Sequence, residues 1–234
     1  MDSNSNDGSK RRGDVSTFMV HLTRNTEDFK SAKENLIDIL CTRVIQPRNS
    51  KGLFYATEGV RDSARTVCFA EAPFNAIKHL IGKHQGRGVE LSTYGLVFSK
   101  DLLIQKGANP VFYINTYAGP ERKGAVMEAI KQLDPHKQKE IAPYVEIFGW
   151  NGSGGIYDFH REREWRYPGD FEFEWKDVIF GLCDDEHIEE MEQLFEKEIK
   201  FISPYMNLEE IFGRMVLSWE ESRYGSYREH FETT

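Results

Sequence analysis

The spacing of hydrophobic residues divides the chain into short strands and helices. Short runs of β-branched and aromatic residues predict strands, whereas apolar residues at intervals of three and four predict helices. The predicted strands cover residues 18–23, 66–70, 94–98, 111–114, 145–149 and 175–181. The predicted helices cover residues 30–41, 75–81, 100–106 and 120–142, with a break at Asp134-Pro135, and two more begin near Asp184 and Asn207. This mixture is typical of an α+β domain.

Helix-boundary residues support several of these assignments. Ser99 is a suitable N-cap for the helix over residues 100–106, and Gly107 a suitable terminator. Asn207 and Glu210 have the spacing of a capping box. The helix before them has one apolar stripe, made of Ile188, Met191, Leu194, Phe195 and Ile199. We therefore expect a disordered polar tail over residues 1–16, a domain over 17–182, and C-terminal helices over 183–234 that pack on that domain.

Composition narrows the functional classes. The net charge of -8 argues against a broad nucleic-acid footprint, which needs a basic face, although a local basic groove remains compatible with it. No apolar run reaches the length of a membrane helix, and the N-terminus has no apolar signal core. Cys41, Cys68 and Cys183 lack metal-like spacing, so zinc is not expected. The expected location is cytoplasmic.

The densest chemistry lies between His160 and Asp170, after the glycine-rich segment 151–155. In an extended chain, successive side chains point to opposite faces. One face would then carry Glu162, Glu164 and Arg166, and the other Arg161, Arg163, Trp165 and Tyr167. Two carboxylates on one strand face indicate a site. The alternative is a solvated strand stabilised by charge pairs.

Three short segments of the chain form a pattern when they are taken together. The first segment combines Val20-His21-Leu22-Thr23 with Asn35-Leu36-Ile37-Asp38-Ile39-Leu40. The second is Val67-Cys68-Phe69-Ala70-Glu71-Ala72-Pro73-Phe74, and the third is Glu162-Arg163-Glu164-Trp165-Arg166. In this order the three segments resemble DarT-like ADP-ribosyltransferases, and more distantly the AbiGi-type abortive-infection proteins of bacteria. Each motif is short, so their order and spacing carry the resemblance. It spans residues 17–182 and implies an ADP-ribosyltransferase-like core of short mixed or antiparallel strands with flanking helices.

The resemblance implies NAD as cofactor and Glu164 as the catalytic glutamate. In such transferases the nicotinamide–ribose bond breaks through an oxocarbenium-like state, which a nearby carboxylate stabilises. Glu162 would contact the acceptor or support Glu164. The chain has no glycine fingerprint of a Rossmann fold, so the expectation of NAD rests on the resemblance.

The resemblance also implies residues that bind NAD. His21 would bind the adenosine-side ribose with Thr23 beside it, although a histidine in an apolar strand, taken alone, is more often a core residue than a functional one. Phe69 would pack near the nicotinamide, where Phe replaces the Tyr of the broader class. One of Arg48, Arg61 and Arg65 would meet the pyrophosphate or act on the acceptor, and Arg65 lies closest to the second segment.

Three functions follow as hypotheses. The first is an ADP-ribosyltransferase or NAD glycohydrolase that acts as a toxin-like or antiphage effector, with a nucleic acid or protein as acceptor and an antitoxin or phage-derived partner. The second is a non-catalytic module that senses a nucleotide or a partner. The third, a hydrolase that uses Glu162 and Glu164, is weaker, because two carboxylates on one strand face do not oppose each other across a substrate.

Overall fold

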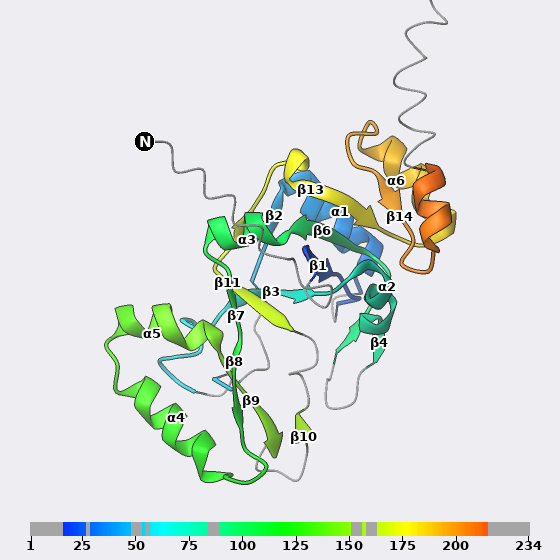
Figure 1. Ribbon diagram of the computed structural model, residues 1–234. Helices are drawn as coiled ribbons and strands as arrows, with labels where there is room; N and C mark the ends of the chain where they lie inside the picture. Colours follow the sequence, from blue (N-terminus) through cyan, green and yellow to red (C-terminus); the bar gives the residue numbers. More distant parts are fainter. Residues whose placement is uncertain are drawn as a thin grey trace, which may run out of the picture.

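The computed structural model describes residues 16–26, 29–47, 53–54, 57–83, 89–150, 156–157 and 163–214 (Figure 1). At residues 150 and 156–157 it describes the backbone alone. The described chain is a mixed α+β fold, which confirms the fold class that the strand and helix patterns predict. The polar N-terminal tail lies outside these ranges up to residue 15, and Ser16 is buried, with its hydroxyl donating to Ala72 O.

A seven-stranded sheet forms the centre of the fold, in the order β14-β13-β6-β1-β3-β11-β7. Neighbouring strands are antiparallel, except that β13 and β14 are parallel. The strands are β1 (Phe18–Leu22), β3 (Thr66–Glu71), β6 (Gly95–Ser99), β7 (Asn109–Pro110), β11 (Glu164–Pro168), β13 (Val178–Leu182) and β14 (Phe201–Ile202).

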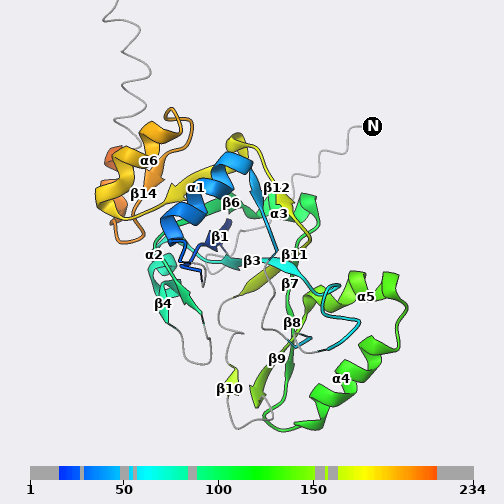
Figure 2. The ribbon, with the colours of Figure 1, turned by 180° about the vertical axis from the view of Figure 1, so that it is seen from behind.

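The two faces of this sheet have separate hydrophobic cores, because alternate residues of each strand point to opposite sides. Figure 2 shows α1 (Ala32–Thr42) lying over β1 and β6 on one face. The core beneath α1 includes Met19, Leu36, Leu40, Phe69 and Phe98. The core on the other face, next to α2 (Phe74–Ile77), includes Val20, Ile77, Val97, Phe180 and Ile202. Each such buried side chain contributes about 1.5–3 kcal/mol to folding.

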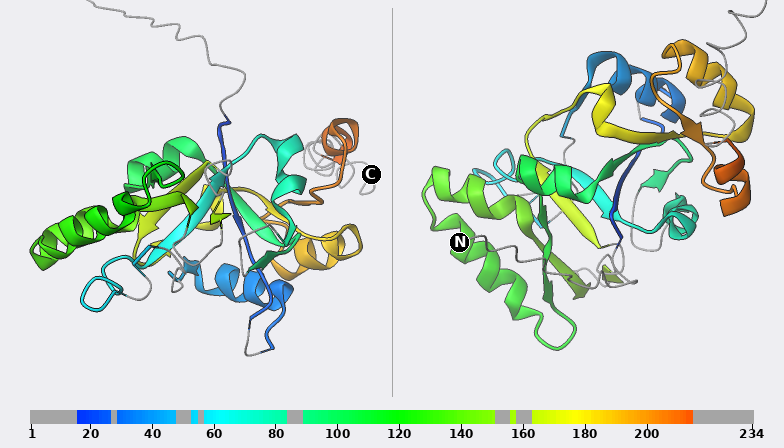
Figure 3. Two further views of the ribbon diagram at one scale, coloured as in Figure 1. Left: turned by 90° about the horizontal axis from the view of Figure 1, so that it is seen from below. Right: turned by 45° about the horizontal axis from the view of Figure 1, so that its top comes forward.

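Two further parts of the chain attach at opposite ends of the main sheet (Figures 1 and 3). Near β7 and β11 lies a three-stranded sheet, with α4 (Glu121–Lys131) and α5 (Pro135–Ile141) packed beside it. Its strands are β8 (Phe112–Asn115), β9 (Val145–Trp150) and β10 (Ile156–Tyr157). At the other end lie α6 (Ile188–Leu194) and β14.

The shorter elements connect these parts. Two pairs of short strands form small sheets, β2 (Val44–Ile45) with β12 (Phe171–Glu172) and β4 (Gly82–Lys83) with β5 (Glu90–Leu91). The helical connections are α3 (Lys100–Lys106) and single 3₁₀ turns at Lys78–Leu80, Ala142–Tyr144, Trp175–Asp177 and Asp185–His187.

Several helix boundaries agree with the local sequence signals. The helix α3 begins after Ser99, whose hydroxyl accepts from Leu102 N, and ends at Gly107 with φ of 98°. The capping box predicted at Asn207 and Glu210 is present, because each side chain accepts from the other residue's backbone N–H. The structure thus confirms these helix boundaries. They can be predicted from local sequence because the capping groups lie within one turn of the helix end.

The C-terminal segment differs from the expectation of helices alone. The helix α6 ends at Leu194, because Glu196 and Lys197 take left-handed φ values of 51° and 62°. The chain then adds β14 to the main sheet beside β13. Gly181 permits this pairing, since a Cβ there would lie 2.2 Å from the ring of Phe201. The apolar stripe is therefore divided between a short helix and the turn that leads to β14, and Leu194 is 51% exposed.

None of the helices in the described ranges combines the length and the hydrophobicity that crossing a membrane requires.

Candidate functional site

Each of the three segments that carry the resemblance contributes to one of three neighbouring strands, β1, β3 and β11, and residues 35–40 of the first segment lie in α1. The antiparallel register pairs Val20 with Ala70, and Ala70 in turn with Glu164. Positions 50 and 94 residues apart in the chain are thus paired in one sheet. Local sequence patterns do not specify this adjacency, which depends on the order of the strands.

His21 lies where β1 and β3 separate. β1 pairs with β6 from Phe18 to Leu22, but its register with β3 covers Met19 and Val20. At the next position, Nδ1 of His21 lies 2.9 Å from Cys68 O. A carbonyl oxygen can only accept, so Nδ1 carries the proton in this contact. The imidazole therefore continues the link between the strands after the backbone ladder ends.

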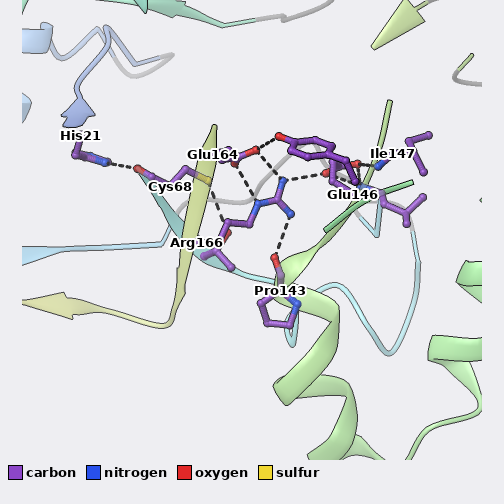
Figure 4. A network of polar contacts seen from close by, with 10 residues as sticks. His21, Cys68, Pro143, Glu146, Ile147, Glu164 and Arg166 are labelled. Atoms are coloured by element: carbon purple, nitrogen blue, oxygen red, sulfur yellow. Dashed lines mark hydrogen bonds and ion pairs between the residues drawn. The ribbon is translucent and has the colours of Figure 1, made fainter. Parts of the chain in front are cut away.

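Glu164 is the centre of a buried polar network at the end of β11 (Figure 4). Arg166 Nε donates to Glu164 Oε1 at 3.1 Å, and Tyr113 Oη donates to Glu164 Oε2 at 2.8 Å. The predicted shared face of Glu164 and Arg166 is therefore confirmed. Both oxygens of the carboxylate have donors, and the residue is 7% exposed.

The same guanidinium bridges the main sheet and the three-stranded sheet. Arg166 Nη2 donates to Glu146 Oε2 on β9 at 3.0 Å, and Nη1 donates to Pro143 O at 3.1 Å. Glu146 also accepts from Leu53 N at 3.1 Å. We call Glu164, Arg166, Glu146 and Tyr113 the β11 network. It carries two carboxylates for one guanidinium and joins three separate parts of the chain.

The charges of this network follow from burial and from the partners. Burial alone would raise the pKa of Glu164, but the charge and hydrogen bonds of Arg166 outweigh it and lower that pKa to about 2. For Cys68, burial and then the Glu164 charge raise the pKa of the thiol to about 12. The same two causes raise the pKa of Tyr113. At neutral pH the network thus presents an ionised carboxylate beside a neutral thiol and a neutral phenol.

This arrangement limits the chemistry that is available. An ionised carboxylate can stabilise a developing positive charge. The Cys68 thiol is not a thiolate, so it is not an activated nucleophile. The Tyr113 phenol stays protonated and its hydroxyl donates a hydrogen bond to Glu164. It can therefore orient that carboxylate but cannot act as a base.

The sequence interpretation missed Glu146 and Tyr113. Glu146 is an acidic residue inside the apolar run Val145-Glu146-Ile147-Phe148 and is 5% exposed. A charged residue inside such a run signals a buried partner, because an unpaired buried charge is costly. Nothing local identifies that partner as Arg166, which lies 20 residues away.

Two residues expected to bind NAD, Phe69 and Thr23, are buried and contact other parts of the fold. Phe69 is 1% exposed and packs edge-on against Phe98 and Phe171, so its ring lies in the hydrophobic core. Thr23 is 5% exposed, and its hydroxyl lies 2.8 Å from Ala32 O at the start of α1. The aromatic and hydroxyl positions of the motif are therefore used for packing and for anchoring the helix.

Arg65 is not brought to Glu164. It is exposed, and its Nη2 donates to Pro47 O at 3.0 Å. It precedes β3 and lies five residues from Ala70, the residue that pairs with Glu164. At about 3.3 Å per strand residue this amounts to about 16 Å. Of the other predicted features, Glu162, Arg48 and the glycine segment 151–155 lie outside the described residues. The described strand begins at Glu164, after Arg163 with a left-handed φ of 45°.

A second carboxylate cluster, which the sequence interpretation also missed, lies on the opposite face of β11. Glu71 Oε2 accepts from Lys100 Nζ at 2.8 Å and from Trp165 Nε1 at 3.1 Å, and Oε1 accepts from Arg163 Nη1 at 3.3 Å. We call these four residues the Glu71 cluster. Trp165 alternates with Glu164 along the strand, which places the two clusters on different faces.

Within the described ranges, histidines, cysteines and carboxylates do not gather in groups of three or more that could hold a metal ion. Comparison of the chain with protein-family models, with curated proteins and with solved structures found no match.

Proposed function

We propose that this protein is an NAD-dependent ADP-ribosyltransferase, or an NAD glycohydrolase, that acts as a toxin-like or antiphage effector. The observation that supports it most is the adjacency of β1, β3 and β11, with Glu164 on β11 and His21 on β1 at the point where β1 and β3 separate. These are the segments that resemble DarT-like transferases, and strands so far apart in the chain had no local reason to become neighbours. The register directs the His21 and Glu164 side chains to opposite faces of the sheet at this point.

In the proposed reaction the bond between the nicotinamide nitrogen and the ribose carbon breaks. Its electron pair leaves with nicotinamide, which departs neutral, and the ribose becomes oxocarbenium-like. A nucleophile on the acceptor, or water, then forms the new bond to that carbon and releases its proton. Glu164, whose pKa is about 2, supplies the negative charge that stabilises the cationic sugar. To do so it exchanges the Tyr113 hydrogen bond for a ribose hydroxyl.

The burial of Glu164 supports a second candidate, a non-catalytic module that senses a nucleotide or a partner in a defence or toxin–antitoxin system. Both carboxylate oxygens already have protein donors, and Phe69 belongs to the core. In this case the β11 network would hold the two sheets together, and ligand binding would proceed without cleavage.

The deciding experiment compares Glu164→Gln with Glu146→Gln. Both substitutions remove one carboxylate charge from Arg166, and the two residues are 7% and 5% exposed, so their structural cost is matched. The wild type and both variants are incubated with labelled NAD, alone and with DNA, RNA or cell lysate. Nicotinamide release and label transfer are measured together with the unfolding midpoint of each protein.

We expect Glu164→Gln to lose about 100-fold or more in rate, the scale of one lost electrostatic contact to a transition state. Glu146→Gln should keep the rate within a few-fold at a similar unfolding midpoint. Equal losses in both variants would mean that the carboxylate acts through the fold. A wild type that binds NAD without releasing nicotinamide would favour the sensing module over the enzyme.

A further inference from the structure

Three aromatic rings form a strip along β8 and β9, which we call the aromatic strip: Tyr113, Phe148 and Tyr117. The ring centroids of Tyr113 and Phe148 are 6.5 Å apart, and those of Phe148 and Tyr117 are 6.3 Å apart, both edge to face. This is the preferred geometry of neighbouring aromatic side chains. Phe69, the aromatic residue that the motif indicates, is not part of the strip.

The strip begins at the β11 network. Tyr113, its first ring, donates its hydroxyl to Glu164 at 2.8 Å. The parallel register pairs Tyr113 with Glu146 and Asn115 with Phe148, so Tyr113, Phe148 and Glu146 share one face of the small sheet. Aromatic surface and the buried Glu146 carboxylate therefore occupy the same side of β8 and β9.

Tyr117 lies at the outer end of the strip, in a tightly specified backbone. Gly149 has φ of 113°, and a Cβ there would lie 2.8 Å from both Thr116 Oγ1 and Tyr117 N. Asn115 Oδ1 accepts from Tyr117 N at 2.9 Å. The glycine and the asparagine together fix the start of this side chain against β9, while the residue remains 43% exposed. A large aromatic side chain is thus held in place where solvent reaches it.

A cation accompanies the exposed ring. Arg122, in the first turn of α4, donates from Nη1 to Asn115 O at 3.1 Å. The same tip of the small sheet therefore offers an aromatic face and a guanidinium, which suit the base and the phosphate of a nucleotide.

We infer that the ring of Tyr117, supported by its edge-to-face contact with Phe148, is a stacking platform for the flat heterocyclic ring of a nucleotide ligand that extends toward Glu164. The inference rests on the proposed function only in naming NAD as one source of that ring. The other source is a base of a nucleic-acid acceptor.

The test uses Tyr117→Ala and Tyr117→Phe in the full chain, with Tyr205→Ala as control. Tyr205 is also an exposed tyrosine, at 60%, but lies between β14 and the C-terminal helix. Calorimetric titrations with NAD, with ADP-ribose and with a single-stranded oligonucleotide separate the possible sources of the ring. The unfolding midpoint of each variant shows that the fold is retained.

We expect Tyr117→Ala to weaken binding of at least one probe about ten-fold, and Tyr117→Phe to keep it, because stacking needs the ring and not the hydroxyl. A loss for both NAD and ADP-ribose places adenine on the platform, and a loss for NAD alone places nicotinamide there. A loss for the oligonucleotide alone places an acceptor base there, and this result stands even if NAD is never cleaved. The inference is overturned if no probe binds, or if Tyr117→Ala weakens binding no more than Tyr205→Ala.

Discussion

Each face of β11 carries a cluster of charged side chains, and the two clusters differ in the ratio of carboxylates to cations and in the exposure of the cations. In the β11 network one guanidinium serves two carboxylates, and the side chains of Arg166, Glu146 and Glu164 are 6%, 7% and 8% exposed. In the Glu71 cluster one carboxylate serves two cations and an indole. There the side chains of Lys100 and Arg163 are 20% and 45% exposed.

The difference shows why burial, and not the number of ion pairs, sets the energetic importance of a cluster. Removing the cation of a buried cluster leaves charges that water cannot reach, which costs several kcal/mol. An exposed cation can be replaced by water and salt, so its removal costs at most about 1 kcal/mol. Burial also bears on whether a carboxylate has a structural or a catalytic role. A buried carboxylate can act on a substrate only if it gives up a hydrogen bond to a protein partner.

The largest expected effect comes from Arg166→Met, which leaves Glu164 and Glu146 without their shared cation. We expect the free energy of unfolding in urea to fall by about 3–5 kcal/mol, the usual cost of breaking a buried pair. The matched change on the other face, Lys100→Met, should cost clearly less than Arg166→Met, because Glu71 keeps Arg163 and Trp165 as partners. Equal losses in the two variants would contradict the comparison.

Acid should weaken the buried cluster next. The folded-state pKa of Glu164 is about 2, below its ordinary value of 4.5. Because the pKa of Glu164 is lower in the folded state than in the unfolded state, its ionisation stabilises the protein at any pH above the unfolded-state pKa. That stabilisation is lost as the pH falls from about 4.5 toward 2. The contribution is on the order of 3 kcal/mol. Unfolding curves of the wild type and Glu164→Gln across this range provide the measurement.

In that experiment the variant should lose less stability than the wild type on acidification. Parallel curves for the two proteins would mean that Glu164 does not carry the acid dependence.

The smallest effect is expected at Arg163, whose ion pair is half exposed and whose φ of 45° is unfavourable for any side chain. Arg163→Ala removes the ion pair and keeps the backbone strain, so we expect a loss of at most about 1 kcal/mol. Arg163→Gly removes both, and should be more stable than the alanine variant by about 1 kcal/mol. Thermal unfolding of both variants at low and high salt measures the contribution of the ion pair and that of the backbone strain. An alanine variant as stable as the glycine variant would argue against strain at this position.

Much of the fold was predictable, but less of the candidate site. The alternation that puts Glu164 and Arg166 on one face is a local property, and the structure confirms it. Phe69 illustrates the limit, because its strand pattern is the same whether the ring faces a ligand or the core. Its burial follows from α1 and β12 covering that face of the sheet.

The sequence by itself determined the elements whose signals lie within one or two turns of chain. Ser99 and Gly107 fix the ends of α3, and Asn207 with Glu210 begins the last helix, because capping groups act on backbone a few residues away.

Only the tertiary structure decided which elements meet. Tyr113 reaches Glu164 across 51 residues of sequence, and Glu146 reaches Arg166 across 20. The strand order determines these contacts, and no local pattern encodes it, since many strand orders can bury the same hydrophobic faces. Whether a carboxylate belongs to the surface or to a buried network is therefore a property of the assembled fold.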